Sequence, residues 1–204
     1  MSITFTVLTG TKTTAGSLAN WVNRSDLPTS IIVAEAEAMI YETLRVREMT
    51  AREALTFGAS TQTAALPTGF LDPISYRPYE WGAPLPFVFE DALEEARDSA
   101  GTLQTGAPSK WTIIGETAYV DVLPSAAFSG ILLYYKTPTA LSGSNETNFL
   151  TNRYPSLLRY ACMAKAYEHM QDGRAAEYIA AAMGAVASAN TTNELWRRAQ
   201  FFPS

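Results

Sequence analysis

Residue types that build catalytic and metal sites are scarce in this sequence. The chain has one cysteine, Cys162, and one histidine, His169, among its 204 residues. A single cysteine excludes an intrachain disulfide framework and is typical of a reducing compartment. One cysteine and one histidine are too few for the usual zinc site, and no stretch alternates Asp and Asn as an EF-hand does. The sequence therefore predicts no metal site and no cofactor, and the alternative left open is a metal bound by carboxylates alone.

Dense basic clusters and long apolar runs are also missing. The net charge is −5 and the pI about 4.9, and the 15 Lys and Arg residues are scattered. Because phosphate neutralisation supplies most nucleic-acid affinity, DNA binding is not expected as the main task. An acidic surface still lets DNA slide past without sticking. No apolar run approaches the ~18–20 residues that span a bilayer, and the start lacks the features of a secretory signal.

One acidic group offers candidate general acids or bases, namely Glu90, Asp91, Glu94 and Glu95. A glycoside hydrolase needs two carboxyls about 5–10 Å apart in unlike environments. The competing interpretation is the solvated first turn of a short helix, where acids favour the helix dipole. Four adjacent, exposed acids fit the helix turn better, so a peptidoglycan hydrolase using Glu90, Glu94 or Glu95 is the lesser alternative.

The spacing of Cys162 and His169 does not favour a catalytic pair of thiol and imidazole. Cys162 and His169 lie seven residues apart, so roughly 10 Å separates their backbones along one helix. That distance is too long for a direct hydrogen bond between nucleophile and base. The sequence also has no GxSxG, P-loop or GxGxxG motif. We therefore expect a protein that is not an enzyme.

Hydrophobic periodicity predicts helices at both ends of the chain and strands between them. Apolar stripes at helical spacing predict helices over residues 29–47, 148–171 and 174–189. Two alternating runs around Gly115-Glu116 predict a hairpin. The expected fold class is α+β, a mainly α-helical bundle formed by the N- and C-terminal helices, with an inserted small antiparallel β domain. The expected divisions are residues 1–49 (arm and helices), 50–140 (β-rich insert), 141–189 (C-terminal helices) and 190–204 (docking tail).

Three local expectations accompany this scheme. The alternation of Ile3, Phe5 and Val7 predicts a short strand or extended arm. The run 128–138 predicts a strand that is buried on both faces. Asp172-Gly173 predicts a turn in which the glycine takes the left-handed conformation.

Aromatic residues gather in two places where an interface is one interpretation. In the Pro-rich stretch these are Tyr76, Tyr79, Trp81, Phe87 and Phe89. Either these rings form a subunit or tail interface, or they close the core of the small sheet, and the sequence leaves both open. The C-terminal stretch holds Trp196, Arg197, Arg198, Phe201 and Phe202. An aromatic terminus must dock or fray, which favours an interface there.

The stretch NETNFLTNRYPSLLRY, residues 145–160, is rich in polar residues but is interpreted as a folding signal. Thr147 and Asn148 are typical helix caps. Pro155 suits the first position of a longer helix, where its missing N–H has no cost. Arg153 and Arg159 are left to face a neighbouring subunit.

Several motifs together resemble one known family. They are SLANWVNRSDLPTSIIVAEAEAMIYETLRVREM, with its WxNR-D turn and its AEA helix ending in LRVREM, then LPTGFLDP, and LLYYKTPTALSGSNETNFLTNRYPSLLRYACMAKAYEHMQD. Over about residues 13–185, their order and spacing resemble the adaptor proteins that join the portal to the tail in tailed bacteriophages.

The resemblance implies a virion structural protein at the head–tail junction, assembled in the host cytoplasm. Such adaptors form a ring, typically a dodecamer, under the portal, extend the DNA channel and present a docking surface to tail or nozzle proteins. C-terminal segments in the family reach the portal, a role that Trp196, Arg197, Arg198, Phe201 and Phe202 would take here. A head-completion or tail-tube component is the alternative among structural proteins.

Overall fold

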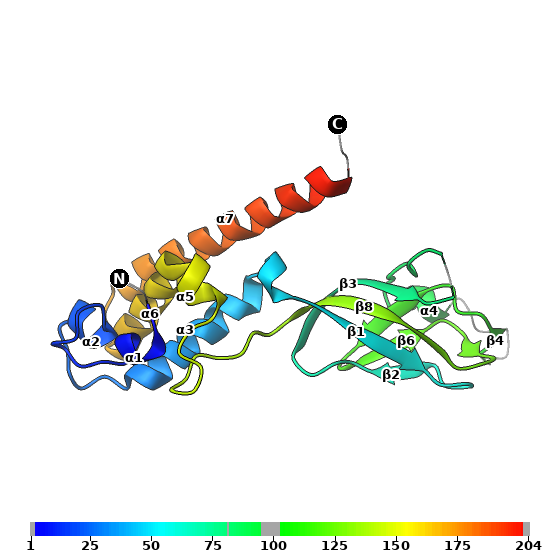
Figure 1. Ribbon diagram of the computed structural model, residues 1–204, viewed down its shortest axis with the longest axis horizontal. Helices are drawn as coiled ribbons and strands as arrows, with labels where there is room; N and C mark the ends of the chain where they lie inside the picture. Colours follow the sequence, from blue (N-terminus) through cyan, green and yellow to red (C-terminus); the bar gives the residue numbers. More distant parts are fainter. Residues whose placement is uncertain (1–2, 81, 95–102, 202–204) are drawn as a thin grey trace. The chain divides into compact units, whose positions relative to one another are not determined.

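The computed structural model describes residues 3–80, 82–94 and 103–201, which form two compact units (Figure 1). The helical unit joins the two ends of the chain, residues 1–48 and 138–204. The β unit is the segment between them, residues 49–137. Two covalent connections, at 48–49 and 137–138, therefore link the units.

The helical unit is organised around α6 (Pro155–His169), which packs against α3 (Thr29–Thr43) and α7 (Ala175–Phe201). α2 (Leu18–Trp21) and α5 (Phe149–Arg153) also contact α6. Small residues let the neighbouring helices approach α6 closely, and four of its small side chains are fully buried: Ala161, Cys162, Ala164 and Ala166. None of the helices in the described part of the chain is both long enough and apolar enough to cross a membrane.

The start of the chain is helical, which corrects the predicted strand or arm. α1 (Phe5–Leu8) begins after Thr4, whose side chain accepts a hydrogen bond from the amide of Val7. The carboxylate of Glu146 accepts from the amide and the hydroxyl of Thr6. Capping of these free amide groups outweighs the alternating pattern, which covers too few residues to fix a strand.

Two predicted helix ends are also wrong. α3 ends at Thr43 rather than at residue 47, because Leu44 is extended (φ −73°, ψ 127°), and a short 3-10 turn, η1 (Arg47–Met49), follows. α7 continues past Ala189 to Phe201, and Figure 1 shows it as the longest helix. At the α6–α7 turn the left-handed residue is Gln171 (φ 54°), not the predicted glycine.

The β unit contains two three-stranded antiparallel sheets and one parallel pair among its described residues. The first sheet has the order β1 (Thr50–Phe57), β8 (Phe128–Lys136), β3 (Phe70–Pro78). The second has the order β2 (Thr63–Ala65), β6 (Thr117–Val120), β5 (Trp111–Ile114). β4 (Thr105–Gly106) pairs with β7 (Leu123–Pro124), and α4 (Asp91–Glu94) is a single turn. β5 and β6 form the hairpin predicted at Gly115-Glu116.

Large aromatic side chains fill the core of the β unit. Tyr76, Trp111, Tyr134 and Phe57 are all fully buried. In the central strand β8 a side chain is not tolerated at Gly130, because an added Cβ would lie 2.5 Å from the carbonyl oxygen of Arg77 on β3. One face of β8 is buried, with Gly130, Leu132 and Tyr134. On the opposite face Tyr135 is buried, whereas Ile131 and Leu133 are half-buried, so the prediction of burial on both faces is partly right.

The predicted fold class is wrong in describing the chain as a mainly helical bundle. The chain is 38% helical and 25% strand, a mixed α+β protein rather than a mainly helical bundle with a small antiparallel insert. β3 adds nine residues to the strand content, because it runs through Pro73 and ends at Pro78. Those prolines are tolerated at a sheet edge, where a strand needs hydrogen bonds on one side only. The pairing of β4 with β7 is parallel, so the β unit is not purely antiparallel either.

Candidate functional site

A buried polar cluster joins α3 to the start of α5. Glu37, on the inward face of α3, is only 2% exposed. Its Oε1 accepts hydrogen bonds from Nδ2 of Asn148 (2.7 Å) and from the hydroxyl of Tyr41 (3.1 Å). Its Oε2 accepts from the backbone amide of Leu141 (2.8 Å). Three donors compensate the buried carboxylate for lost water.

Asn148 also caps α5, as the sequence predicted. Its Oδ1 accepts from the amides of Leu150 and Thr151, and the hydroxyl of Thr151 accepts from the amide of Asn148, which completes a capping box. One asparagine thus starts α5 and supplies a donor to Glu37. Sequence reasoning missed Glu37, although a glutamate on the apolar stripe of an amphipathic helix is the available signal for such a residue.

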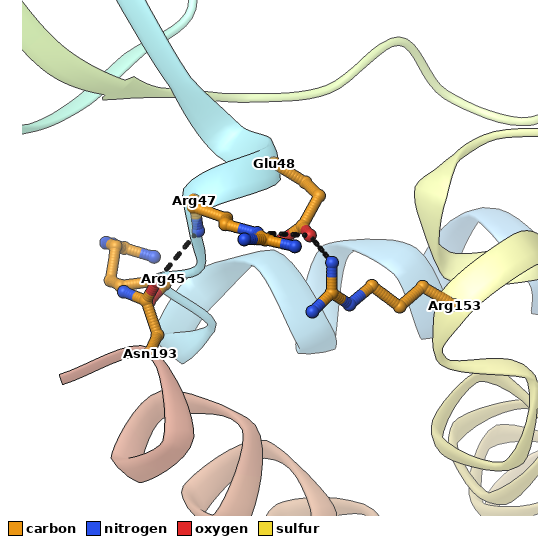
Figure 2. A network of polar contacts seen from close by, with 5 residues as sticks. All are labelled: Arg45, Arg47, Glu48, Arg153 and Asn193. Carbon is orange, nitrogen blue, oxygen red and sulfur yellow. Dashed lines mark hydrogen bonds and ion pairs between the residues drawn. The ribbon is translucent and has the colours of Figure 1, made fainter. Parts of the chain in front are cut away.

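A second polar cluster holds the segment that leaves α3. The amide of Arg45 donates to Oδ1 of Asn190 (2.8 Å), and Nδ2 of Asn190 donates to the carbonyl of Thr43 (2.9 Å). One helical turn further along α7, Oδ1 of Asn193 accepts from the amide of Arg47 (3.1 Å), and its Nδ2 donates to the carbonyl of Arg45 (3.0 Å). Figure 2 shows Asn193 reaching this backbone from α7.

The two asparagines act as a neighbouring strand would. Each amide side chain offers one acceptor and one donor, the same pair that a peptide group offers in a sheet. Asn190 and Asn193 lie three residues apart, so they share one face of α7. They therefore satisfy four backbone groups of residues 43–47 that would otherwise be left unpaired by the end of α3.

The guanidinium of Arg45 completes the end of α3. Its Nη1 donates to the carbonyl oxygens of Tyr41 (2.9 Å) and Leu44 (2.7 Å). The last carbonyls of a helix lack intrahelical partners and carry the negative end of the helix dipole. A cation at this position is therefore stabilising.

Two cations meet one carboxylate beside this segment. Oε1 of Glu48 accepts from Nε of Arg47 (3.2 Å) and also pairs with Nη1 of Arg153 (Figure 2). The three side chains, with Tyr154 and Asn193, are among the residues that line a small cavity of about 90 Å³. Glu48 therefore ties η1 to the end of α5 within the helical unit. The cluster has the chemistry of a structural junction, since it contains no nucleophile paired with a base.

The arginines predicted to face a neighbouring subunit have partners within the chain. Arg153 pairs with Glu48 and lies over the ring of Tyr154, with its guanidinium carbon 5.9 Å from the ring centroid. Arg159 lies over Trp21, with its guanidinium carbon 5.1 Å from the ring centroid. Both residues are exposed enough to contact another molecule, so a role in assembly stays a prediction.

The aromatic residues of the Pro-rich stretch divide between core and surface. Tyr76 is fully buried and donates from its hydroxyl to the carbonyl of Leu55 (3.2 Å), so it closes the core of the β unit. Tyr79 is 61% exposed, and Phe87 and Phe89 are exposed as well. Trp81 lies outside the described residues. Of the two interpretations left open by the sequence, the core is right for Tyr76, and the surface is available to Tyr79.

The C-terminal candidates lie at the end of α7. The backbone of Trp196, Arg197, Arg198 and Phe201 is helical, and the side chains of these four residues fall outside the described part of the chain. Phe202 lies outside the described residues altogether. Their proposed contact with the portal is therefore untested by the structure.

The candidate catalytic groups do not come together. Glu90 and Asp91 are exposed at the start of α4, Glu94 ends that helix, and Glu95 lies outside the described residues. Burial, with a smaller contribution from Glu37, raises the pKa of the Cys162 thiol to about 12, which makes it a poor nucleophile. Within residues 3–80, 82–94 and 103–201, no three His, Cys, Asp or Glu side chains group as metal ligands.

A comparison with models of protein families identifies a match to this chain. The family model described as SU10 adaptor protein matches residues 12–200, which is nearly the whole chain. No curated protein matches the chain. The family match covers both units, and it includes α7 almost to its end.

Proposed function

The chain belongs to the SU10 adaptor protein family, and on that premise we propose that it joins the portal to the tail of a bacteriophage. The family is structural rather than enzymatic, so the protein is a phage adaptor and a virion component. The single observation that carries the proposal is the family match over residues 12–200.

The adaptor assembles as a ring, with a dodecamer as the expected number of subunits. A closed ring of identical subunits needs two different surfaces on each copy, one for each neighbour. Arg159 and Tyr79 are candidates for these surfaces, because each is accessible on a different unit. Arg153 is a third candidate. In the structure it pairs with Glu48.

The ring extends the DNA channel without specific binding to DNA. The net charge of −5 supports this role, because a phosphate backbone is not attracted to an acidic wall. Repulsion between like charges keeps a passing polymer from being trapped, and salt shortens the range of that repulsion.

The portal contacts the C-terminal end of α7, at Trp196, Arg197, Arg198, Phe201 and Phe202. Aromatic residues and arginine are the side chains most enriched in the energetic centres of interfaces. Because Asn190 and Asn193 hold the segment after α3, a truncation that tests this contact must keep them. A chain that ends at Leu195 removes every candidate and preserves both asparagines.

A mixing experiment tests the function. Purified portals and purified tails from the same phage are mixed with and without the chain, and joined particles are counted by sedimentation. We expect joined particles only when the chain is present, and we expect the chain ending at Leu195 to be folded by circular dichroism but unable to join them. Joining without the chain would refute the adaptor role. Full activity of the truncated chain would refute the C-terminal contact alone.

A further inference from the structure

The β unit carries a groove that is much larger than the cavity beside Glu48. Its volume is about 730 Å³. The turn that precedes β3, the β5–β6 hairpin and Phe87 form its walls. This size falls within the range of sites that accept a ligand or several side chains of a partner.

The walls of the groove combine apolar and polar surface in similar amounts, and three of the apolar side chains also pack against the core behind them. Leu66, Phe70 and Ile113 line the groove while also packing against the buried core of the β unit. Phe87 is 50% exposed, and its ring meets Trp111 edge-on with the centroids 5.1 Å apart. A rigid, partly exposed apolar wall is where an inserted side chain gains most from leaving water.

Two glycines shape the rim where a side chain would be strained. Gly69 has φ +76° and Gly115 has φ +60°, both in the left-handed region that glycine adopts without penalty. Each sits at a turn that lines the groove. The turns therefore hold the groove open through the backbone rather than through flexible side chains.

The charged residues that line the groove are acidic, while Lys136, which pairs with Glu53, lies close to the lining residue Gly69. Among the described residues that line the groove, the charged ones are Asp72 and Glu116, and both are exposed acids. Lysine or arginine on a partner would gain from these carboxylates, and an acidic partner would be repelled. The groove therefore selects a segment with bulky apolar side chains and basic neighbours.

We propose that this groove is the docking site for the tail-side partner of the adaptor. Its occupant is a loop or terminal segment that inserts apolar side chains against Phe87 and Ile113 and sets Lys or Arg beside Glu116 and Asp72. The inference rests on the proposed function, which supplies a tail-side partner. The proposal assigns the two contacts to different parts of the chain: α7 binds the portal, and the β unit binds the tail-side partner.

A second copy of the chain is the rival occupant. In this sequence the stretch that combines paired arginines with aromatic residues is 196–202, WRRAQFF. Because we propose that this stretch contacts the portal, another protein is the favoured occupant of the groove. Loss of self-association on changing the groove would reveal the rival.

Two variants with matched controls test the proposal in the full-length chain. Phe87→Ala removes an exposed groove ring, and Tyr160→Ala removes an exposed ring of the helical unit that does not line the groove. Glu116→Lys reverses a rim charge, and Glu80→Lys reverses an exposed charge elsewhere on the β unit. Thermal unfolding checks that all four variants are folded. Binding to purified tails, to purified portals and to itself is then measured for each.

We expect the Phe87→Ala, Glu116→Lys double variant to bind tails about tenfold more weakly or worse, with portal binding and self-association unchanged. Both control variants should bind tails within about twofold of the parent chain. We also expect added salt to weaken binding of the parent chain more than that of Glu116→Lys. Unchanged tail binding by a folded double variant would overturn the proposal, as would loss of self-association with tail binding retained. If the parent chain binds neither portals nor tails, the proposed function itself fails.

Discussion

The Nδ2 of Asn148 donates a 2.7 Å hydrogen bond to Oε1 of Glu37, and these residues are 111 positions apart in the sequence. The same asparagine caps α5 through its Oδ1. The contact therefore fixes where the C-terminal part of the helical unit begins relative to α3, and it uses both functional groups of a single amide side chain.

Loss of this amide should destabilise the helical unit strongly. Asn148→Ala removes a helix cap and leaves the buried Glu37 carboxylate without one of its three donors. The combined loss is about 2–4 kcal/mol in the free energy of unfolding. Urea denaturation followed by circular dichroism measures it. Asn152→Ala, an exposed change on the same helix, should stay within about 0.5 kcal/mol of the parent, and equal losses in both variants would contradict the account.

The two asparagines of α7 should protect different amides. Asn190→Ala should speed hydrogen exchange at the amide of Arg45, and Asn193→Ala should speed it at the amide of Arg47, because each supplies the acceptor for that one amide. Two-dimensional NMR resolves the two signals. Thr192→Ala, an exposed change between them, should affect neither. Equal acceleration of both amides in each variant would show that the segment is released as a whole.

Asp172, in the turn between α6 and α7, should titrate at a lower pH than an ordinary aspartate. A hydrogen bond from the Arg174 side chain, followed by one from its backbone amide, lowers the pKa of Asp172 to about 2. Because the folded pKa lies below the unfolded value of about 4, this stabilisation is present above pH 4 and is lost as the pH falls through about 2. Carbon NMR of the Asp172 carboxyl measures the midpoint.

Arg174→Ala should move the Asp172 midpoint back toward the ordinary range for aspartate. Arg24→Ala serves as the control, because Arg24 makes the equivalent pair with Asp26 instead. If the Asp172 midpoint is the same in the parent chain and in Arg174→Ala, the pair seen in the structure does not persist in solution.

The single thiol should be inert in the folded protein. Cys162 is fully buried in α6, and burial raises its pKa to about 12. At pH 8 we expect negligible reaction with a chromogenic disulfide reagent in native protein and complete reaction in 6 M guanidinium. Rapid labelling of native protein would mean that α6 opens frequently, since the thiolate and access are both required for reaction.

Local signals in the sequence predicted the elements whose ends are marked by proline or glycine. Pro155 marks the first residue of α6, and Gly115-Glu116 marks the β5–β6 hairpin, as the structure confirms. These features depend on neighbours a few residues away. The ordered motifs likewise identified the adaptor family correctly.

Contacts between distant segments were not predictable in the same way. The burial of Glu37 depends on donors at Leu141 and Asn148, more than a hundred residues further on. The alternation of Ile3, Phe5 and Val7 favoured a strand, but Glu146 meets the amide and hydroxyl of Thr6 and α1 forms instead. In both cases the decisive partner comes from across the fold, where no local period can show it.

The most direct test of the account is electron microscopy of portal rings incubated with the purified chain. The account predicts an added ring of adaptor subunits on one face of each portal, with the central channel open. It also predicts that the chain ending at Leu195 leaves the portals bare. Portals that stay bare in the presence of excess full-length, folded chain would contradict the central claim.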